Sequence, residues 1–132
     1  MSQRETVFQA FVSAASAVGS VTVLPRRLRP ASVDQLPVAM MVAGDVRRAR
    51  QAYNLVENRL QIVVMIIAET ITEVEAAGTE LITAIDSDTS LASVIESVAL
   101  SGISEDAEQV AQQINHQQLT FELVYMTTAL GY

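Results

Sequence analysis

Hydrophobic residues recur at helical spacing at the start of the chain, and a capping pattern precedes them. Ser2 and Glu5 fit a capping box, in which the serine oxygen and the glutamate each satisfy a backbone N–H at a helix start. Gly19 is a residue type at which helices commonly stop. We therefore predict a helix over residues 2–18, with an apolar stripe formed by Val7, Phe8, Phe11, Val12, Ala15 and Val18.

Short β-prone runs and prolines follow this helix. The run Val21–Leu24 ends at Pro25, and the proline-bracketed residues 25–30 predict a surface loop. A second run, Val38–Ala43, is entered through Pro37, a position that a strand start tolerates. The pattern predicts two strands separated by a loop.

Residues 44–56 begin with the turn signal Gly44–Asp45 and fit either a long hairpin loop or a short helical turn. We favour an extended, mobile β-hairpin arm that joins two long strands. The next segment, Leu60–Ala68, is dense in β-branched residues and apolar on both faces. Such a strand is expected at the centre of a sheet.

Helical spacing returns after this strand. Thr70 and Glu73 form a second capping box, which opens a helix over about residues 71–85. Asp86–Asp88 breaks this helix and caps a third, predicted over about residues 89–100 and ended by Gly102. The residues expected to point inward from the third helix are Leu91, Val94, Ile95 and Val98.

Strict alternation marks the end of the chain. The polar residues 104–116 lead into residues 117–128, in which apolar positions alternate with Gln118, Thr120 and Glu122. This period of two predicts a half-buried strand. The complete order predicts a single α+β domain over residues 1–132, with a mainly antiparallel sheet and helices packed on one face.

Charge is divided unevenly along the 132 residues, whose net charge is −7. Residues 1–59 hold all eight arginines, no lysine and four acidic residues, a net of +4. Residues 60–132 hold eleven acidic residues and no basic one, a net of −11. Either the two halves pair their charges within one subunit, or copies dock basic surface to acidic surface, head to tail, and close into a ring.

Several function classes are disfavoured by the composition. An acidic chain is a poor general nucleic-acid binder, because phosphate contact depends on basic surface. The longest apolar run, Ile62–Ala68, is seven residues, whereas a membrane helix needs about 20. The first residues lack the apolar core of a signal peptide, so we expect a cytosolic protein with no membrane partner.

The sequence holds few residues that could form a catalytic, cofactor-binding or metal site. The absence of cysteine excludes disulfides, thiolate metal sites and a cysteine nucleophile, and His116 is the single histidine. Asp86–Ser90 resembles the start of a calcium loop, but the glycine and the final acid of that loop are missing. Glu69, Glu73 and Glu75 fit a helix start better than an acid–base pair. We expect no enzyme, no cofactor and no metal.

Arginine and tyrosine together suggest an interface instead. Both are residue types enriched in binding hot spots. The candidate residues for a subunit or partner interface lie in two groups, Arg26, Arg27 and Arg29, and Arg47, Arg48, Arg50 and Tyr53.

Element order and texture resemble one family. The first helix, the segment L-P-V-A-M-M-V at 36–42, the strand at 60–68 with its capped helices, and L-T-F-E-L-V-Y-M-T at 119–127 occur in a matching order. On these segments the chain resembles the tail terminator, or tail completion, proteins of long-tailed bacteriophages, which are minor tail proteins.

The resemblance implies a homohexameric ring in the virion, at the head-proximal end of the tail, assembled in the host cytoplasm. Such a ring stops growth of the tail tube and offers a surface for head attachment. The implied partners are further copies of the chain, the major tail tube protein and the head-tail connector protein. Genomic DNA would pass through the ring without specific binding, along a channel lined or rimmed by the acidic residues 60–132.

Two alternatives remain open at this stage. The chain is otherwise another neck component of the virion, such as a head-closure or adaptor ring. From a different class, a small ligand-binding α+β dimer of the cytosol would also fit the element order.

Overall fold

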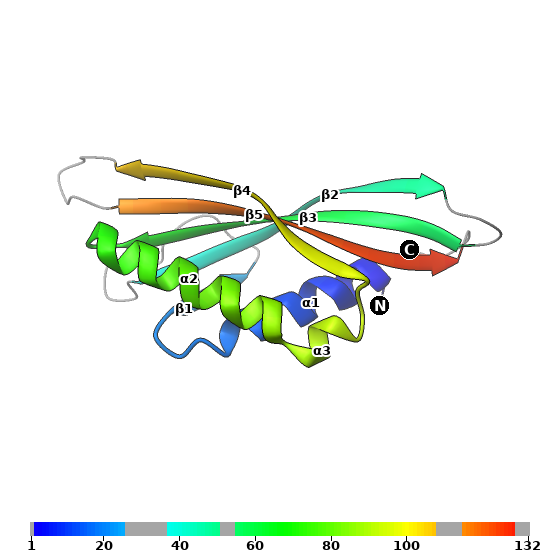
Figure 1. Ribbon diagram of the computed structural model, residues 1–132, viewed down its shortest axis with the longest axis horizontal. Helices are drawn as coiled ribbons and strands as arrows, with labels where there is room; N and C mark the ends of the chain where they lie inside the picture. Colours follow the sequence, from blue (N-terminus) through cyan, green and yellow to red (C-terminus); the bar gives the residue numbers. More distant parts are fainter. Residues whose placement is uncertain (1, 26–36, 51–54, 108–114, 129–132) are drawn as a thin grey trace.

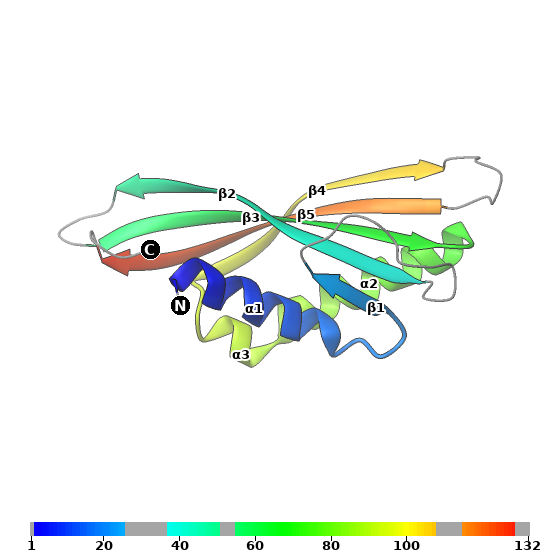
Figure 2. The same ribbon diagram turned by 180° about the vertical axis from the view of Figure 1, so that it is seen from behind.

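The computed structural model describes residues 2–25, 37–50, 55–107 and 115–128. Within them, three helices lie on one face of a five-stranded sheet (Figures 1 and 2). The predicted α+β class with a mainly antiparallel sheet is confirmed. The elements are α1 (Gln3–Ser16), β1 (Thr22–Pro25), β2 (Val38–Arg50), β3 (Leu55–Ala68), α2 (Ile71–Ser87), α3 (Thr89–Ala92), β4 (Ser97–Ala107) and β5 (Asn115–Thr128).

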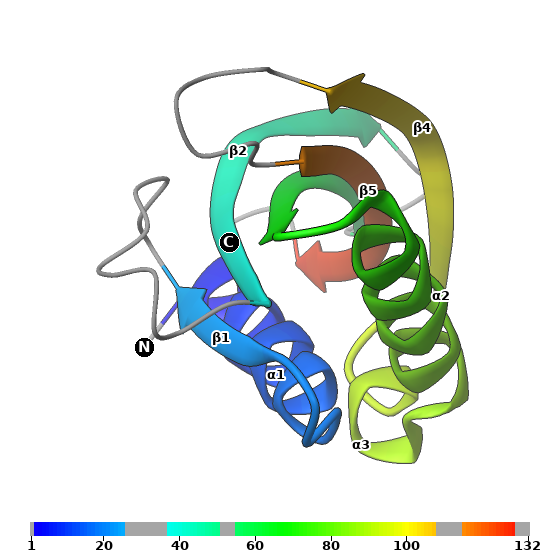
Figure 3. The ribbon, with the colours of Figure 1, turned by 90° about the vertical axis from the view of Figure 1, so that its left-hand side faces the viewer.

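The sheet has the strand order β1-β2-β3-β5-β4, with β3 at its centre as predicted. Only β1 runs parallel to its neighbour in this sheet, and the other three pairings are antiparallel. The long strands twist strongly, and seen end-on the sheet curls with the helices along one side (Figure 3). Two faces result, which we call the helix-side face and the open face.

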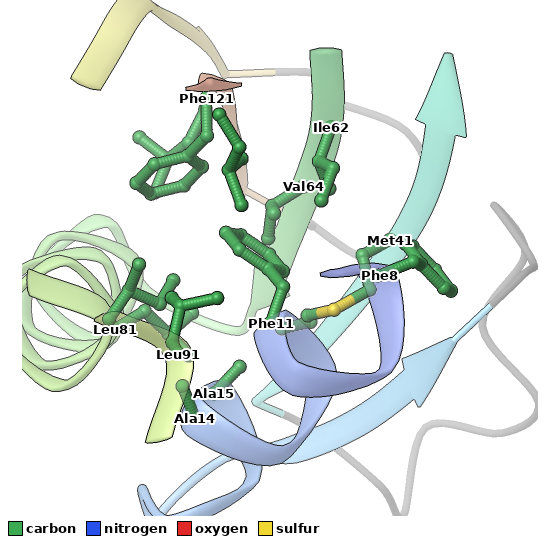
Figure 4. Close-up of a cluster of buried hydrophobic side chains, with 14 of the residues drawn as sticks. Phe8, Phe11, Ala14, Ala15, Met41, Ile62, Val64, Leu81, Leu91 and Phe121 are labelled. Atoms are coloured by element: carbon green, nitrogen blue, oxygen red, sulfur yellow. The ribbon is translucent and has the colours of Figure 1, made fainter. Parts of the chain in front are cut away.

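The main core lies between the helix-side face and the helices (Figure 4). The rings of Phe11 in α1 and Phe121 in β5 meet edge to face, with centroids 5.2 Å apart. Leu81 of α2 and Leu91 of α3 reach the same cluster. Each helix therefore contributes to one continuous apolar interior, whose burial is the main driving force for folding.

The open face carries a smaller apolar cluster at one end of the sheet. Val38, Met40 and Ile67 are buried there, and Leu24 and Met65 pack against them. Ile62, Val64 and Ile66 of the same strand β3 belong to the main core. This confirms that β3 is apolar on both faces over its second half.

Both predicted capping boxes supply an N-cap. The Ser2 hydroxyl accepts the Glu5 backbone N–H at 3.1 Å, and the Thr70 hydroxyl accepts that of Glu73 at 3.2 Å. Thr70 also donates its hydroxyl proton to the Glu73 carboxylate, at 3.1 Å. These contacts satisfy backbone donors that the first turn of a helix leaves open.

The predicted third helix over residues 89–100 is confirmed in its start at Thr89 and its Asp88 cap, but it is wrong in its length. Helix α3 ends at Ala92, and β4 begins at Ser97. Val98 and Leu100 pack against the core from alternate positions, so the segment follows a period of two. Gly102 ends no helix but lies at a register shift within β4. An apolar run as short as this fits both periods, and pairing with β5 decides for the strand.

Candidate subunit interface

One end of the sheet extends past the helices, and it carries the candidate arginines of β2 (Figures 1 and 2). There residues 46–50 of β2 pair with residues 56–60 of β3. The expected arm over residues 44–56 is therefore largely the continuation of two long strands. Residues 51–54 lie outside the described part of the chain.

A β-bulge decides which way these arginines face. Ala43 is opposite Ile62 and Val46 is opposite Leu60, so β2 has one extra residue between these pairs. Because side chains alternate along a strand, the extra residue moves Val46 to the helix-side face and Arg47 to the open face. Arg4 of α1 fixes the bulge, since its Nη2 donates to the Gly44 carbonyl oxygen at 3.1 Å.

On the open face, Arg47 lies beside an ion-paired cluster. It is directly opposite Arg59 of β3. The Arg59 guanidinium binds the carboxylates of Glu57 at 3.0 Å and Glu122 at 3.3 Å. The hydrogen bond with Glu57 and the two negative charges raise the pKa of Arg59, so it stays cationic at every physiological pH. The exposed Arg47 thus extends a charged surface across three strands.

On the helix-side face, Arg48 is exposed and lies opposite the buried Asn58. The Asn58 Nδ2 donates to the Val56 and Tyr125 carbonyl oxygens at 3.1 and 3.3 Å. It also donates to the Thr127 hydroxyl at 2.9 Å. These bonds tie β3 to β5 beneath Arg48 and hold this end of the sheet together.

The other candidate residues are placed only in part. Arg50 is the last residue of β2, opposite Val56, and its side chain is outside the description. The group Arg26, Arg27 and Arg29, and also Tyr53, lie outside the described residues. The structure therefore brings Arg47 and Arg48 onto one strand but does not place the two predicted groups relative to each other.

Two of the residues considered for catalysis or metal binding, Asp88 and Glu73, take part in helix caps. The Asp88 Oδ1 accepts the Leu91 backbone N–H at 2.7 Å and caps α3. Glu69 and Glu75 are exposed, and Glu73 belongs to the Thr70 cap. His116 lies in β5, opposite Ile67 and Asp106. In residues 2–25, 37–50, 55–107 and 115–128, no group of three or more His, Asp or Glu side chains is arranged to hold a metal ion.

No described helix combines the length and apolarity that a bilayer span requires.

Strand β4 is the feature that sequence reasoning missed. It forms the outer strand of the sheet on the side opposite β1, and its large apolar residue Ile103 is 54% exposed. Glu96, which directly precedes β4, is exposed and donates its backbone N–H to the Val124 carbonyl oxygen at 2.6 Å. The sequence signal for this strand is weak, because smaller and larger residues alternate only over Ser97–Ser101, before Gly102 interrupts the period of two.

Comparisons with known proteins identify a similar fold. No protein-family model matches the chain, and no curated protein sequence matches it. Among solved structures, it is similar to a chain of the "virion of native gene transfer agent (GTA) particle", with a TM-score of 0.54 and 14% sequence identity. The match covers 92% of each chain. Nearly the whole chain therefore shares the fold of a virion component.

Proposed function

We propose that this chain is a non-enzymatic structural protein of a bacteriophage-type virion. The observation that carries the proposal is the fold match over 92% of both chains to a component of a virion. A match confined to one helix pair or one hairpin would say little, but this one covers 92% of both chains with a TM-score of 0.54. The sequence features that resemble tail terminators point in the same direction.

Within the virion, we propose a homohexameric ring at the head-proximal end of the tail. One face of the ring binds the last ring of major tail tube protein by shape and charge. The opposite face differs from the tube's own end, so no further tube subunit adds, and it serves head attachment through the connector. The acidic residues 60–132 would favour a channel wall that repels DNA phosphates and lets the genome slide through.

The interface residues of this proposal are Arg26, Arg27, Arg29, Arg47, Arg48, Arg50 and Tyr53. Support comes from the extended end of the sheet, where Arg47 and Arg48 are exposed on opposite faces of β2. An arginine can pair two carboxylate oxygens at once, which gives a subunit contact both strength and direction.

The test is polymerisation of purified tail tube protein with and without this chain. We expect tubes that stop growing when the chain is added, with the chain at one end of each tube. Unchanged growth together with binding to the purified connector protein would support the other neck role, a head-closure or adaptor ring. Binding to neither component would contradict the proposed function.

A further inference from the structure

The sheet presents two edges without a strand neighbour among the described residues. On one side, β1 covers only Val38–Met41 of β2 and leaves Val42–Arg50 without a paired strand there. Within this stretch the Gly44 carbonyl oxygen already accepts from Arg4, so a further strand would bond the residues on either side of the bulge. On the other side, β4 pairs with β5 alone. Edge strands expose backbone N–H and C=O groups that can bond a further strand. We call these two segments the basic edge, Val42–Arg50, and the acidic edge, Ser97–Ile103 with the preceding Glu96.

The charges at and beside the two edges are opposite in sign, although Ser97–Ile103 itself holds no charged residue. Arg47 and Arg48 are exposed on the basic edge, where Asp45 contributes one acid in the bulge. Beside the start of the acidic edge, Asp86, Asp88 and Glu96 line one shallow hollow. Across the sheet, Arg47 is level with Arg59, Val124 and then Ser97, so both charged groups lie at the same height along the strands.

The basic edge also has open hollows beside it, whose lining mixes apolar and charged residues: Glu5 lines the smaller and Asp45 the larger. Two adjoining hollows of about 240 and 360 Å³ follow it between β2 and the first turns of α1, and Arg4 lines both. Phe8 and Val42 line the smaller hollow. On the acidic edge, Ile103 is the matching feature, because more than half of its surface is exposed.

We propose that the acidic edge of one copy pairs with the basic edge of the next and continues the sheet from subunit to subunit. This rests on the proposed function, which requires a ring of identical copies. Since the two edges differ, the contact is head to tail, and repeating it closes a ring when the rotation per subunit allows. Within one copy, β2 and β4 run antiparallel to each other. If the ring axis runs along the strands, the β4 of one copy and the β2 of the next are also antiparallel.

A charge-swap experiment tests the pairing. Variant one is Arg47→Glu/Arg48→Glu, and variant two is Asp86→Arg/Glu96→Arg. Each alone places like charges at every contact, so we expect its ring population in sedimentation velocity to fall at least tenfold. In an equimolar mixture of the two variants, alternating copies place opposite charges at every contact, so we expect rings to return. The quadruple variant, which carries all four substitutions in one chain, should form rings for the same reason. The control is Glu75→Arg/Glu80→Arg at exposed positions of α2 outside both named edges, which makes the same change in net charge as variant two and should leave rings intact. Because Glu80 accepts the Ser20 hydroxyl, circular dichroism of this control checks first that it is folded.

Hydrogen exchange gives a second readout. Amides of Ser97–Ile103 should exchange more slowly in wild-type rings than in either variant alone, because edge pairing bonds them. If the wild-type chain forms rings and each charge-reversed variant alone forms them equally well, edge pairing is overturned and the proposed function stands. A wild-type chain that stays monomeric at every concentration, with or without tail tubes, would overturn both.

Discussion

Asn58 is a polar residue with a fully buried side chain at the end of the sheet that carries the candidate interface. Its Nδ2 donates to two backbone carbonyls and to the Thr127 hydroxyl, so it couples β3 to β5. Its Oδ1 has no hydrogen-bond partner. The site therefore uses asparagine as a donor and leaves its acceptor unused. No other side chain of this size offers the same two N–H donors.

Replacing Asn58 tests this role. Asn58→Ala should lower the free energy of unfolding by about 1–3 kcal/mol, because buried acceptors lose their donors. Asn58→Asp should cost more at neutral pH, since a carboxylate would face carbonyl oxygens and burial raises its pKa. The difference between the two variants should narrow as the pH falls and the carboxyl becomes protonated. Urea unfolding at several pH values measures it.

The exposed Gln61 on the same strand supplies the control. Gln61→Ala should change stability by no more than about 0.5 kcal/mol. Equal losses at Asn58 and Gln61 would mean that the buried bonds contribute nothing special.

At the scale of elements, α2 approaches the sheet closely through a glycine. A Cβ at Gly78 would overlap the side-chain oxygen of Gln117 in β5 and would come within 3.6 Å of the Ile66 side chain. Glycine costs a helix interior about 1 kcal/mol relative to alanine. At this position the missing side chain lets α2 lie directly on the buried Gln117 of β5.

Gly78→Ala gains about 1 kcal/mol of helix propensity but displaces the buried Gln117 side-chain amide. The two effects oppose each other, so the variant should be less stable than wild type by no more than about 1 kcal/mol and should not gain the full propensity term. Gln117→Ala opens space for the new methyl, so the double variant should lose less than the two single losses added together. Chemical denaturation of all four proteins measures this coupling.

Gly19→Ala is the matched control, because nothing lies within 4 Å of a Cβ there. It should be neutral or slightly stabilising. Additive losses for Gly78→Ala and Gln117→Ala would contradict the close contact between them.

Elements with a single strong signal were predictable from the sequence. The capping boxes at Ser2 and Thr70 and the β-branched run of β3 specify local structure that the fold keeps. Strand β4 was not predictable in the same way, because Leu91–Val98 satisfies helical spacing as well. The sequence predicts a turn at Gly44–Asp45, where the structure has a bulge, because a local sequence signal does not show that β2 continues beyond it.

For the candidate interface, too, some features could be predicted from the sequence and others could not. Residue type alone indicated Arg47 and Arg48, because arginines near a tyrosine are typical of binding surfaces. Which face each arginine occupies depends on the bulge, and the open edge of β4 depends on long-range pairing. Such pairings are set by the folded sheet and leave no mark on any short stretch of sequence.

At the scale of the whole molecule, the uneven charge along the chain becomes a difference between two edges of one sheet. The basic residues of β2 and the acids beside β4 lie on opposite sides of the same subunit. Internal pairing is also present, since Arg59 joins Glu57 and Glu122 within the subunit. Pairing within one subunit is therefore present at Arg59, and head-to-tail docking of copies through the two edges stays a prediction.

Removing the arginines of β2 should separate assembly from folding. The triple variant Arg47→Ala/Arg48→Ala/Arg50→Ala should keep the wild-type circular dichroism spectrum and melting temperature within a few degrees. Ring formation and tube capping should weaken strongly, because the basic edge loses its charge. Rings and capping that persist in this variant would show that the interface has been assigned to the wrong residues.

Salt should have the same effect on the wild-type protein. Raising the ionic strength from about 0.01 M to 1 M shortens the screening length from about 30 Å to about 3 Å. Subunit association should weaken over this range, as measured by light scattering, while the subunit itself stays folded. Association that strengthens with salt would indicate that apolar contact, and not charge, holds the copies together.

Electron microscopy of tail tubes grown with the wild-type chain is the most direct measurement. We expect a closed ring of this chain at one end of each tube, with the basic edge of every subunit beside the acidic edge of its neighbour. Tubes whose ends lack the chain, or carry it along their whole length, would contradict a terminating role.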